Sequence, residues 1–173
     1  MAKAMQCEEA IVGSLELYVE KVGDPTAEIY SRFFARYPHA EELFGTDDDD
    51  YLKRCMMDRV FWLLLEVADG SLAPHLAGYW VTDHVSWEIT QEMITDMFDI
   101  IVSVFRDGIG AGWTGEMEQA WATLMAAMAP HVEREVRDSM SVKASISTLE
   151  SRREALAALP SSACPATREM PAG

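Results

Sequence analysis

Apolar residues recur every three or four positions along almost the whole chain, and no segment alternates apolar and polar residues as a half-buried strand would. A clear example is the segment 90–107, where Met93, Met97 and Ile101 fall on one helical face. A helix with one apolar face buries that face against other helices. The sequence therefore predicts an all-α fold of six to eight helices joined by short connections.

Local signals predict where these helices begin and end. Gly23 and Pro25 end the first helix, and Asp24 is expected to cap the second. Pro38 interrupts the second helix and starts a short helical turn. We expect helices over about 11–22, 25–37, 38–44, 51–68, 72–83 and 90–107, then a turn at Gly108, Gly110 and Gly112, and a last helix capped by Thr114 that passes Pro130 and reaches Arg152 or beyond.

The 173 residues are enough for one domain with its own core. We predict a domain over residues 1–140 and a helical extension over 141–159. In the segment 160–173, prolines and small residues replace apolar ones, which predicts a mobile tail.

Charge and composition argue against several classes of protein. The net charge of −15 repels phosphate backbones and no basic stripe offsets it, so we do not expect a nucleic-acid partner. No apolar run is long enough to insert into a membrane, and residues 1–9 do not resemble a secretory signal. Three widely spaced cysteines, Cys7, Cys55 and Cys164, suit a reducing cytoplasm.

The sequence points to no catalytic residue. It contains no GxSxG motif, no glycine-rich phosphate loop and no HExxH metal motif, which argues against hydrolase and kinase chemistry. The 11 methionines are explained either by an adaptable core or by a core that moulds around a large flat ligand.

Four segments carry a family resemblance. They are residues 29–44 (IYSRFFARYPHAEELF), the amphipathic helix starting near Leu52, residues 84–89 (HVSWEI) and residues 108–121 (GIGAGWTGEMEQAW). In this order they resemble the bacterial single-domain globins and the haem domain of flavohaemoglobins. The separation of His84 from Trp121 also matches the separation expected in bacterial globins.

The resemblance implies a globin fold around one haem b (iron protoporphyrin IX), with His84 as the proximal iron ligand. A backbone carbonyl near Trp80 is the expected acceptor for the second N–H of that imidazole. His75 is the alternative ligand, whereas His39 and His131 are expected outside the pocket. The implied function is reversible binding of a diatomic gas (O2, NO or CO) for storage, scavenging or NO dioxygenation.

The resemblance also implies the rest of the pocket. The tyrosine that would donate a hydrogen bond to a bound gas is Tyr30, and Phe44 would wedge the haem. A shift of one residue in the distal helix would place Lys53 instead of Leu52 over the iron. The residues implied to contact haem are Tyr30, Phe44, Leu52, Met56, Val60, Trp80, Trp87, Ile89 and Met97.

Two departures from flavohaemoglobins limit the expected activity. The chain has Ile94 where that family has a tyrosine that helps to charge the proximal imidazole, which argues against a peroxidase-like role. The sequence also has no GxGxxG and no flavin or nicotinamide domain, so an NO dioxygenase would need a separate reductase. Two other functions stay open: a sensor globin acting on a partner in trans, and a haem-free globin-like protein. A homodimer through the last two long helices is compatible with the resemblance.

Overall fold

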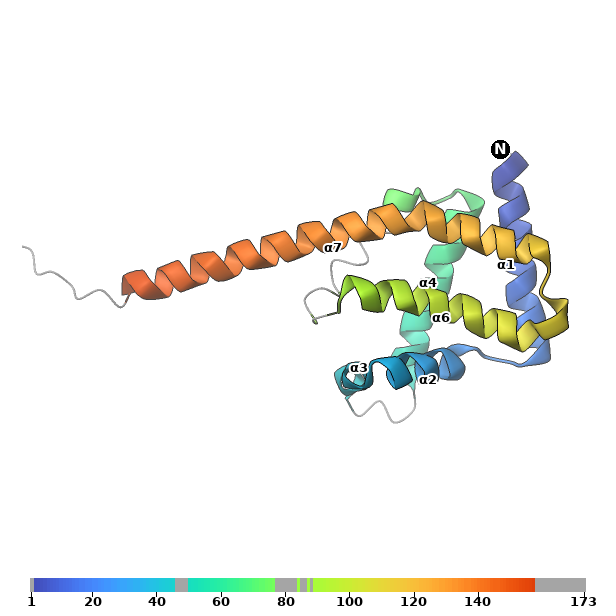
Figure 1. Cartoon of the computed structure of the whole chain (residues 1–173), viewed down its shortest axis with the longest axis horizontal. Helices are drawn as coiled ribbons and strands as arrows, with labels where there is room; N and C mark the ends of the chain where they lie inside the picture. Colours follow the sequence, from blue (N-terminus) through green and yellow to red (C-terminus); the bar gives the residue numbers. More distant parts are fainter. Residues whose placement is uncertain (1, 46–49, 77–83, 85–86, 88, 158–173) are drawn as a thin grey trace, which may run out of the picture. The chain divides into compact units, whose positions relative to one another are not determined.

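A computed structural model describes residues 2–45, 50–76, 84, 87 and 89–157 (Figure 1). These residues form helices and no strand, which confirms the prediction of an all-α protein. The elements are α1 (Ala2–Lys21), α2 (Thr26–Arg36), α3 (Pro38–Glu41), η1 (Glu42–Phe44), α4 (Tyr51–Asp69), α6 (Gln91–Ile109), η2 (Gly110–Gly112) and α7 (Gly115–Ala157).

The chain divides into two units, unit 1 (Met1–Ser139) and unit 2 (Met140–Gly173), and α7 is continuous across the boundary. In unit 1, α6 lies between α2 and the first part of α7, whereas α1 and α4 run across its direction (Figure 1). In this way α6 becomes the central helix of the unit.

Phe105 on α6 joins four helices in the core. Its ring meets Tyr18 of α1 at 4.7 Å, Phe61 of α4 at 5.8 Å and Trp121 of α7 at 5.9 Å between centroids. The buried indole N–H of Trp121 donates a hydrogen bond to Ser14 Oγ at 2.9 Å. The large rings therefore fill the core while the buried indole N–H of Trp121 keeps a hydrogen-bond partner.

Side chains cap three helices. Asp24 Oδ1 accepts from the backbone N–H of Thr26 at 2.8 Å, which confirms the role predicted for Asp24, although Pro25 precedes the first helical residue. Thr90 and Thr114 accept from the backbone three residues later, each at 3.2 Å. These bonds satisfy N–H groups that a helix start would leave unpaired, and the predicted cap at Thr114 is confirmed.

The prediction of a turn at Gly108 is wrong. The helix continues through Gly108 to Ile109, and η2 follows from Gly110. A Cβ at Gly108 would lie 2.3 Å from the Tyr18 ring, so close helix packing, not a turn, requires glycine there. Lys21 Nζ donates a hydrogen bond to the Ile109 carbonyl at 2.9 Å. Its positive charge stabilises the C-terminal end of α6, where the helix dipole is negative.

The core face of α4 begins at Met57 and includes Leu63 and Ala68. Met57 is buried, whereas Leu52 is 42 % exposed. The fully packed positions continue through Val60 and Leu64 to Val67. Leu52 and Met56, which the resemblance implies to contact haem, lie beside this row.

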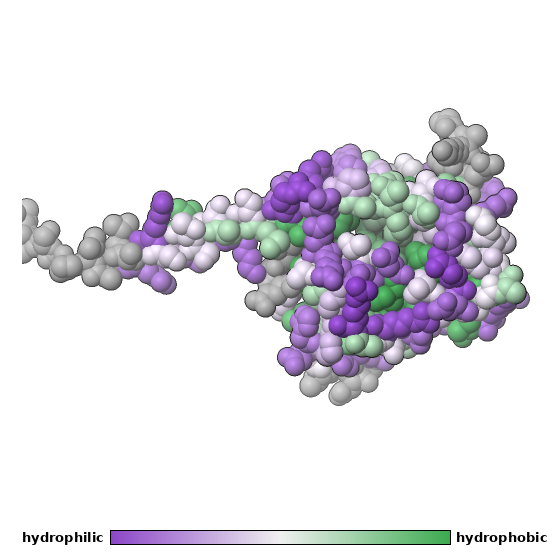
Figure 2. Space-filling model, in the orientation of Figure 1, coloured by the Kyte–Doolittle hydropathy of each residue, from purple (hydrophilic) through white to green (hydrophobic). Residues whose placement is uncertain are grey.

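Several predictions fall on residues that the structure does not describe. They concern the second part of the helix expected at 72–83, Trp80, Cys164 and the tail at 160–173. In the part of the chain that is described, no helix has the length and apolar character needed to cross a membrane. Polar residues cover much of the face seen in Figure 2, with apolar groups showing between them.

Candidate functional site

Unit 1 holds an apolar cavity of about 330 Å³, a volume within the range of small-molecule sites. Helices α2, α4 and α6 contribute to its walls, together with the short elements α3 and η1 and the residues just before α6. Almost all the lining side chains are aliphatic, aromatic or methionine. Such a site excludes water and favours a ligand with a large apolar surface.

The cavity brings together the residues that sequence motifs had singled out. Those that line it are Tyr30, Phe44, Leu52, Met56, Val60, His84, Trp87, Ile89 and Met97. Trp80 lies outside the described residues. Segments that are far apart in the sequence thus meet around one cavity, as a single binding site requires.

Other lining residues were not among those that the resemblance implied to contact haem. They are Phe33, Ala40, Leu43, Met57, Met93, Ile94 and Phe98. The helical period pointed to some of them, because Phe33 and Met93 lie on the apolar faces of α2 and α6. Phe33, Ala40 and Leu43 lie within the motif segment 29–44, whereas Met57, Met93, Ile94 and Phe98 lie on the helices α4 and α6, whose packing decides which side chains reach the cavity.

Two lining side chains carry the polar chemistry that the motifs implied, Tyr30 and His84. Tyr30 is 4 % exposed, and its ring packs on Phe34 and Phe44 at 5.4 and 5.2 Å. A buried phenol keeps its hydroxyl as the one polar point on an otherwise apolar ring. The aromatic contacts fix the position of Tyr30 in the cavity wall.

His84 organises the segment that follows it. Its backbone carbonyl accepts from the N–H of Trp87 at 3.0 Å and from that of Ile89 at 3.3 Å. Both residues line the cavity with His84, although Trp87 is also 64 % exposed. The carbonyl near Trp80 that would orient the imidazole lies outside the described residues.

The other histidines lie elsewhere. His75 and His131 place their rings 6.2 Å apart, and His39 lies 6.2 Å from the ring of Tyr37. None of the three lines the cavity, whereas His84 does. This arrangement favours His84 over His75 as the imidazole of the site.

The start of α4 places Leu52, not Lys53, in the cavity wall. Lys53 Nζ forms an ion pair with Asp50 Oδ1 at 2.7 Å and lies 5.7 Å from the centre of the Phe34 ring. The one-residue shift that would place Lys53 in the cavity does not occur in this arrangement.

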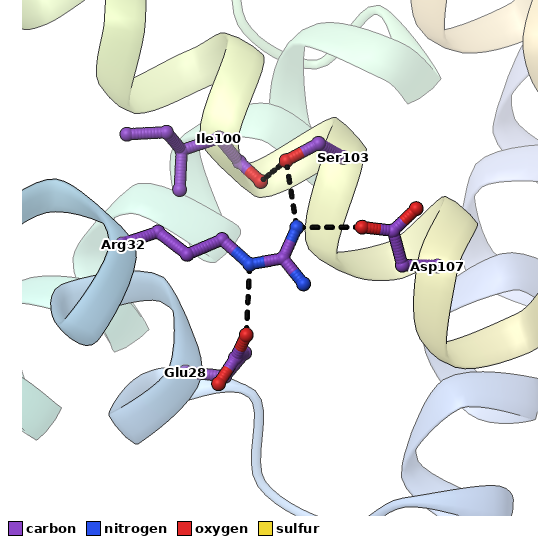
Figure 3. Close-up of polar contacts among 5 residues, drawn as sticks. All are labelled: Glu28, Arg32, Ile100, Ser103 and Asp107. Carbon is purple, nitrogen blue, oxygen red and sulfur yellow. Dashed lines mark hydrogen bonds and ion pairs between the residues drawn. The ribbon is translucent and has the colours of Figure 1, made fainter.

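A polar cluster around Arg32 ties α2 to α6 (Figure 3). Arg32 bonds Glu28 on its own helix at 2.8 Å and reaches across to Asp107 at 2.7 Å and Ser103 at 3.3 Å. The bonds to Asp107 and Glu28 raise the pKa of Arg32. Ser103 Oγ in turn donates to the Ile100 carbonyl.

A second cluster joins the same helices near the end of α2. The hydroxyl of Tyr37 donates to Asp96 Oδ2, and Arg36 Nε pairs with that oxygen at 2.7 Å. Burial and the bond to Asp96 raise the pKa of Tyr37 to about 12. Together the two clusters hold the helix that carries Tyr30 against the helix that carries Met93 and Met97.

Comparisons with protein-family models, curated proteins and solved structures found no match for this chain. The likeness to globins therefore rests on the motifs in the sequence.

Proposed function

We propose that unit 1 is a globin that binds one haem b in the cavity, with His84 as the proximal iron ligand. The observation that carries this proposal is the meeting of His84, Tyr30 and other residues from three of the four motif segments around one apolar cavity: residues 29–44, the helix starting near Leu52, and residues 84–89. A chance resemblance in sequence gives no reason for these segments to share a cavity.

The lining residues fit such a group. A porphyrin needs apolar walls and one imidazole for its iron, and the cavity offers both. When bound, the haem supplies an iron that coordinates O2, NO or CO reversibly. His84 would hold the iron, the methionines and aromatic rings exclude water, and the Tyr30 hydroxyl donates a hydrogen bond to a gas ligand.

The activity proposed is reversible gas binding for O2 storage or scavenging, with NO dioxygenation where a separate reductase is present. Ile94 lines the cavity where flavohaemoglobins have a tyrosine, so this position supplies no phenol to charge the proximal imidazole. That substitution argues against peroxide chemistry. Cys7 and Cys55 are unpaired, which fits the proposed cytoplasmic location.

Titration of the purified chain with haemin tests the proposal. The wild-type chain should bind one equivalent and develop a sharp Soret band, and His84→Ala should weaken binding and alter the band. The matched control is His75→Ala, which should behave as the wild type because His75 does not line the cavity. Loss of binding in His75→Ala with retention in His84→Ala would overturn the assignment, and a wild-type chain that takes up no haemin would favour the haem-free alternative.

A second candidate, a gas sensor acting on a partner in trans, is favoured by the exposed part of α7 in unit 2, residues 140–154. If a partner bound there responds to the ligand, the presence of that partner must change gas affinity, because coupling between two sites is reciprocal. Equal CO affinities for the wild type and for Ile146→Glu/Leu149→Glu, both measured in a cell lysate that contains the partner, would exclude this candidate.

A further inference from the structure

The part of α7 that belongs to unit 2 presents an apolar row to solvent. Val142, Ile146 and Leu149 are each between 51 and 62 % exposed. They are spaced by four and then three residues, so they lie on one face of the helix. Both polar and apolar residues are visible on this part of the helix in Figure 2.

This stretch of helix has no packing of its own. Every residue from Met140 to Glu154 is exposed, and Ser145 and Thr148 turn their hydroxyls back onto carbonyls of their own helix. Most of the stability of a helix in a protein comes from packing of its apolar face, and on this stretch that face is uncovered. A partner that covers the row would supply the missing stability.

The row and its flanking charges follow a seven-residue repeat. Val142, Ile146, Leu149 and Arg153 occupy the core positions of a coiled coil, and Lys143 and Glu150 occupy the same flanking position in successive repeats. Polar or small residues fill most of the outer positions, with Met140 as an exception.

We propose that residues 139–153 pair with the same segment of a second copy of this chain as an antiparallel two-stranded coiled coil. The two-fold axis lies between Ile146 and Leu149. Ile146 of each copy therefore packs against Leu149 of the other copy. The same register places Lys143 beside Glu150 of the second copy, and symmetry forms that ion pair twice.

The charges favour the antiparallel arrangement over the parallel one. Parallel strands would place the two Arg153 side chains opposite each other in the core, whereas antiparallel strands place Arg153 against Val142, where its aliphatic stem can pack. Residues 140–154 carry three basic and two acidic side chains, so the negative net charge of the chain comes from residues outside this stretch, mostly residues 1–139. In the antiparallel arrangement, the ends of the segment that lead back to these acidic residues point in opposite directions in the two copies.

The charges beside the apolar row favour a second copy of this chain, rather than a membrane surface, as the partner that covers it. Its flanks carry both signs of charge, and a strongly acidic chain is repelled by anionic lipid. The pairing does not depend on haem, because none of its residues lines the cavity.

Sedimentation velocity of the full chain over micromolar to millimolar concentrations tests for the pair. The wild type should show a concentration-dependent dimer, and Ile146→Glu/Leu149→Glu should stay monomeric at every concentration. The control Ser147→Glu/Ser151→Glu adds the same charge on the outer face and should still form the dimer. Circular dichroism of each variant checks that its helices still form.

Exchange of the flanking charges tests the orientation. Lys143→Glu alone should weaken the dimer by placing like charges together, and Lys143→Glu/Glu150→Lys should restore it. In parallel strands Lys143 would instead face Asp138 of the second copy, so the double exchange would give no rescue. A wild-type chain that is monomeric throughout, or binds lipid vesicles through this face without dimerising, overturns the proposal, and a dimer without rescue overturns the antiparallel orientation.

Discussion

At the scale of single residues, Tyr30 decides how the cavity would hold a small ligand. Its ring is fixed between Phe34 and Phe44, so the phenol cannot swing away without breaking aromatic contacts. A hydrogen-bond donor in an apolar cavity stabilises a bound molecule that carries partial negative charge, because no water competes for it. The rate at which such a ligand leaves therefore depends on the hydroxyl.

Tyr30→Phe removes this donor and keeps the ring. With haem bound, O2 dissociation measured by stopped flow should speed up by about tenfold, the effect of losing one net hydrogen bond of about 1.4 kcal/mol. CO dissociation should change much less, since CO carries little charge. Tyr37→Phe is the control, because Tyr37 does not line the cavity. An unchanged O2 dissociation rate in Tyr30→Phe would show that the hydroxyl makes no hydrogen bond to the bound O2.

At the scale of helices, the contact of Gly108 with Tyr18 sets how closely α1 and α6 approach. Gly108→Ala should destabilise the fold by about 1–3 kcal/mol, because the new Cβ would overlap the Tyr18 ring. Gly13→Ala is the matched control within α1: nothing lies within 4 Å of the added Cβ, and the change should stabilise by about 0.5–1 kcal/mol. Urea unfolding measures both, and equal effects would contradict this account of the helix contact.

The bond between Tyr37 and Asp96 makes the contact of α2 with α6 sensitive to alkaline pH. The pKa of Tyr37 rises from 10.0 to about 12 on folding, so the folded state holds the phenolic proton more tightly than the unfolded state. The contribution to stability is complete below pH 10 and is lost as the pH rises towards about 12. The difference in the free energy of unfolding between the wild type and Tyr37→Phe should shrink between pH 10 and about 12. A difference that stays constant with pH would contradict this prediction.

The sequence predicted the helices better than the details of their contacts. Their periodicity and the caps at Asp24 and Thr114 depend on neighbouring residues, so local patterns were sufficient. The helical role of Gly108 could not be predicted in the same way, because it depends on Tyr18 in another helix. Likewise Met57 and Phe98 line the cavity because of the way α4 and α6 pack, which no single motif records.

At the scale of the whole molecule, the two units have different requirements for a partner. Unit 1 has its own core and an apolar cavity that would be covered by a bound group. The described part of unit 2 is a helix with an uncovered apolar row, for which a second copy is proposed. Since neither partner depends on the other, haem binding and dimer formation should be separable by variants at His84 and at Ile146 with Leu149.

Absorbance spectra of the haemin-loaded chain, after reduction and then after addition of CO, test the central proposal most directly. A haem held by His84 in an apolar cavity should give a reduced spectrum of histidine-ligated iron and a Soret band that shifts sharply and reversibly with CO. A chain that remains colourless, or whose spectrum matches free haemin and does not change in His84→Ala, would contradict it.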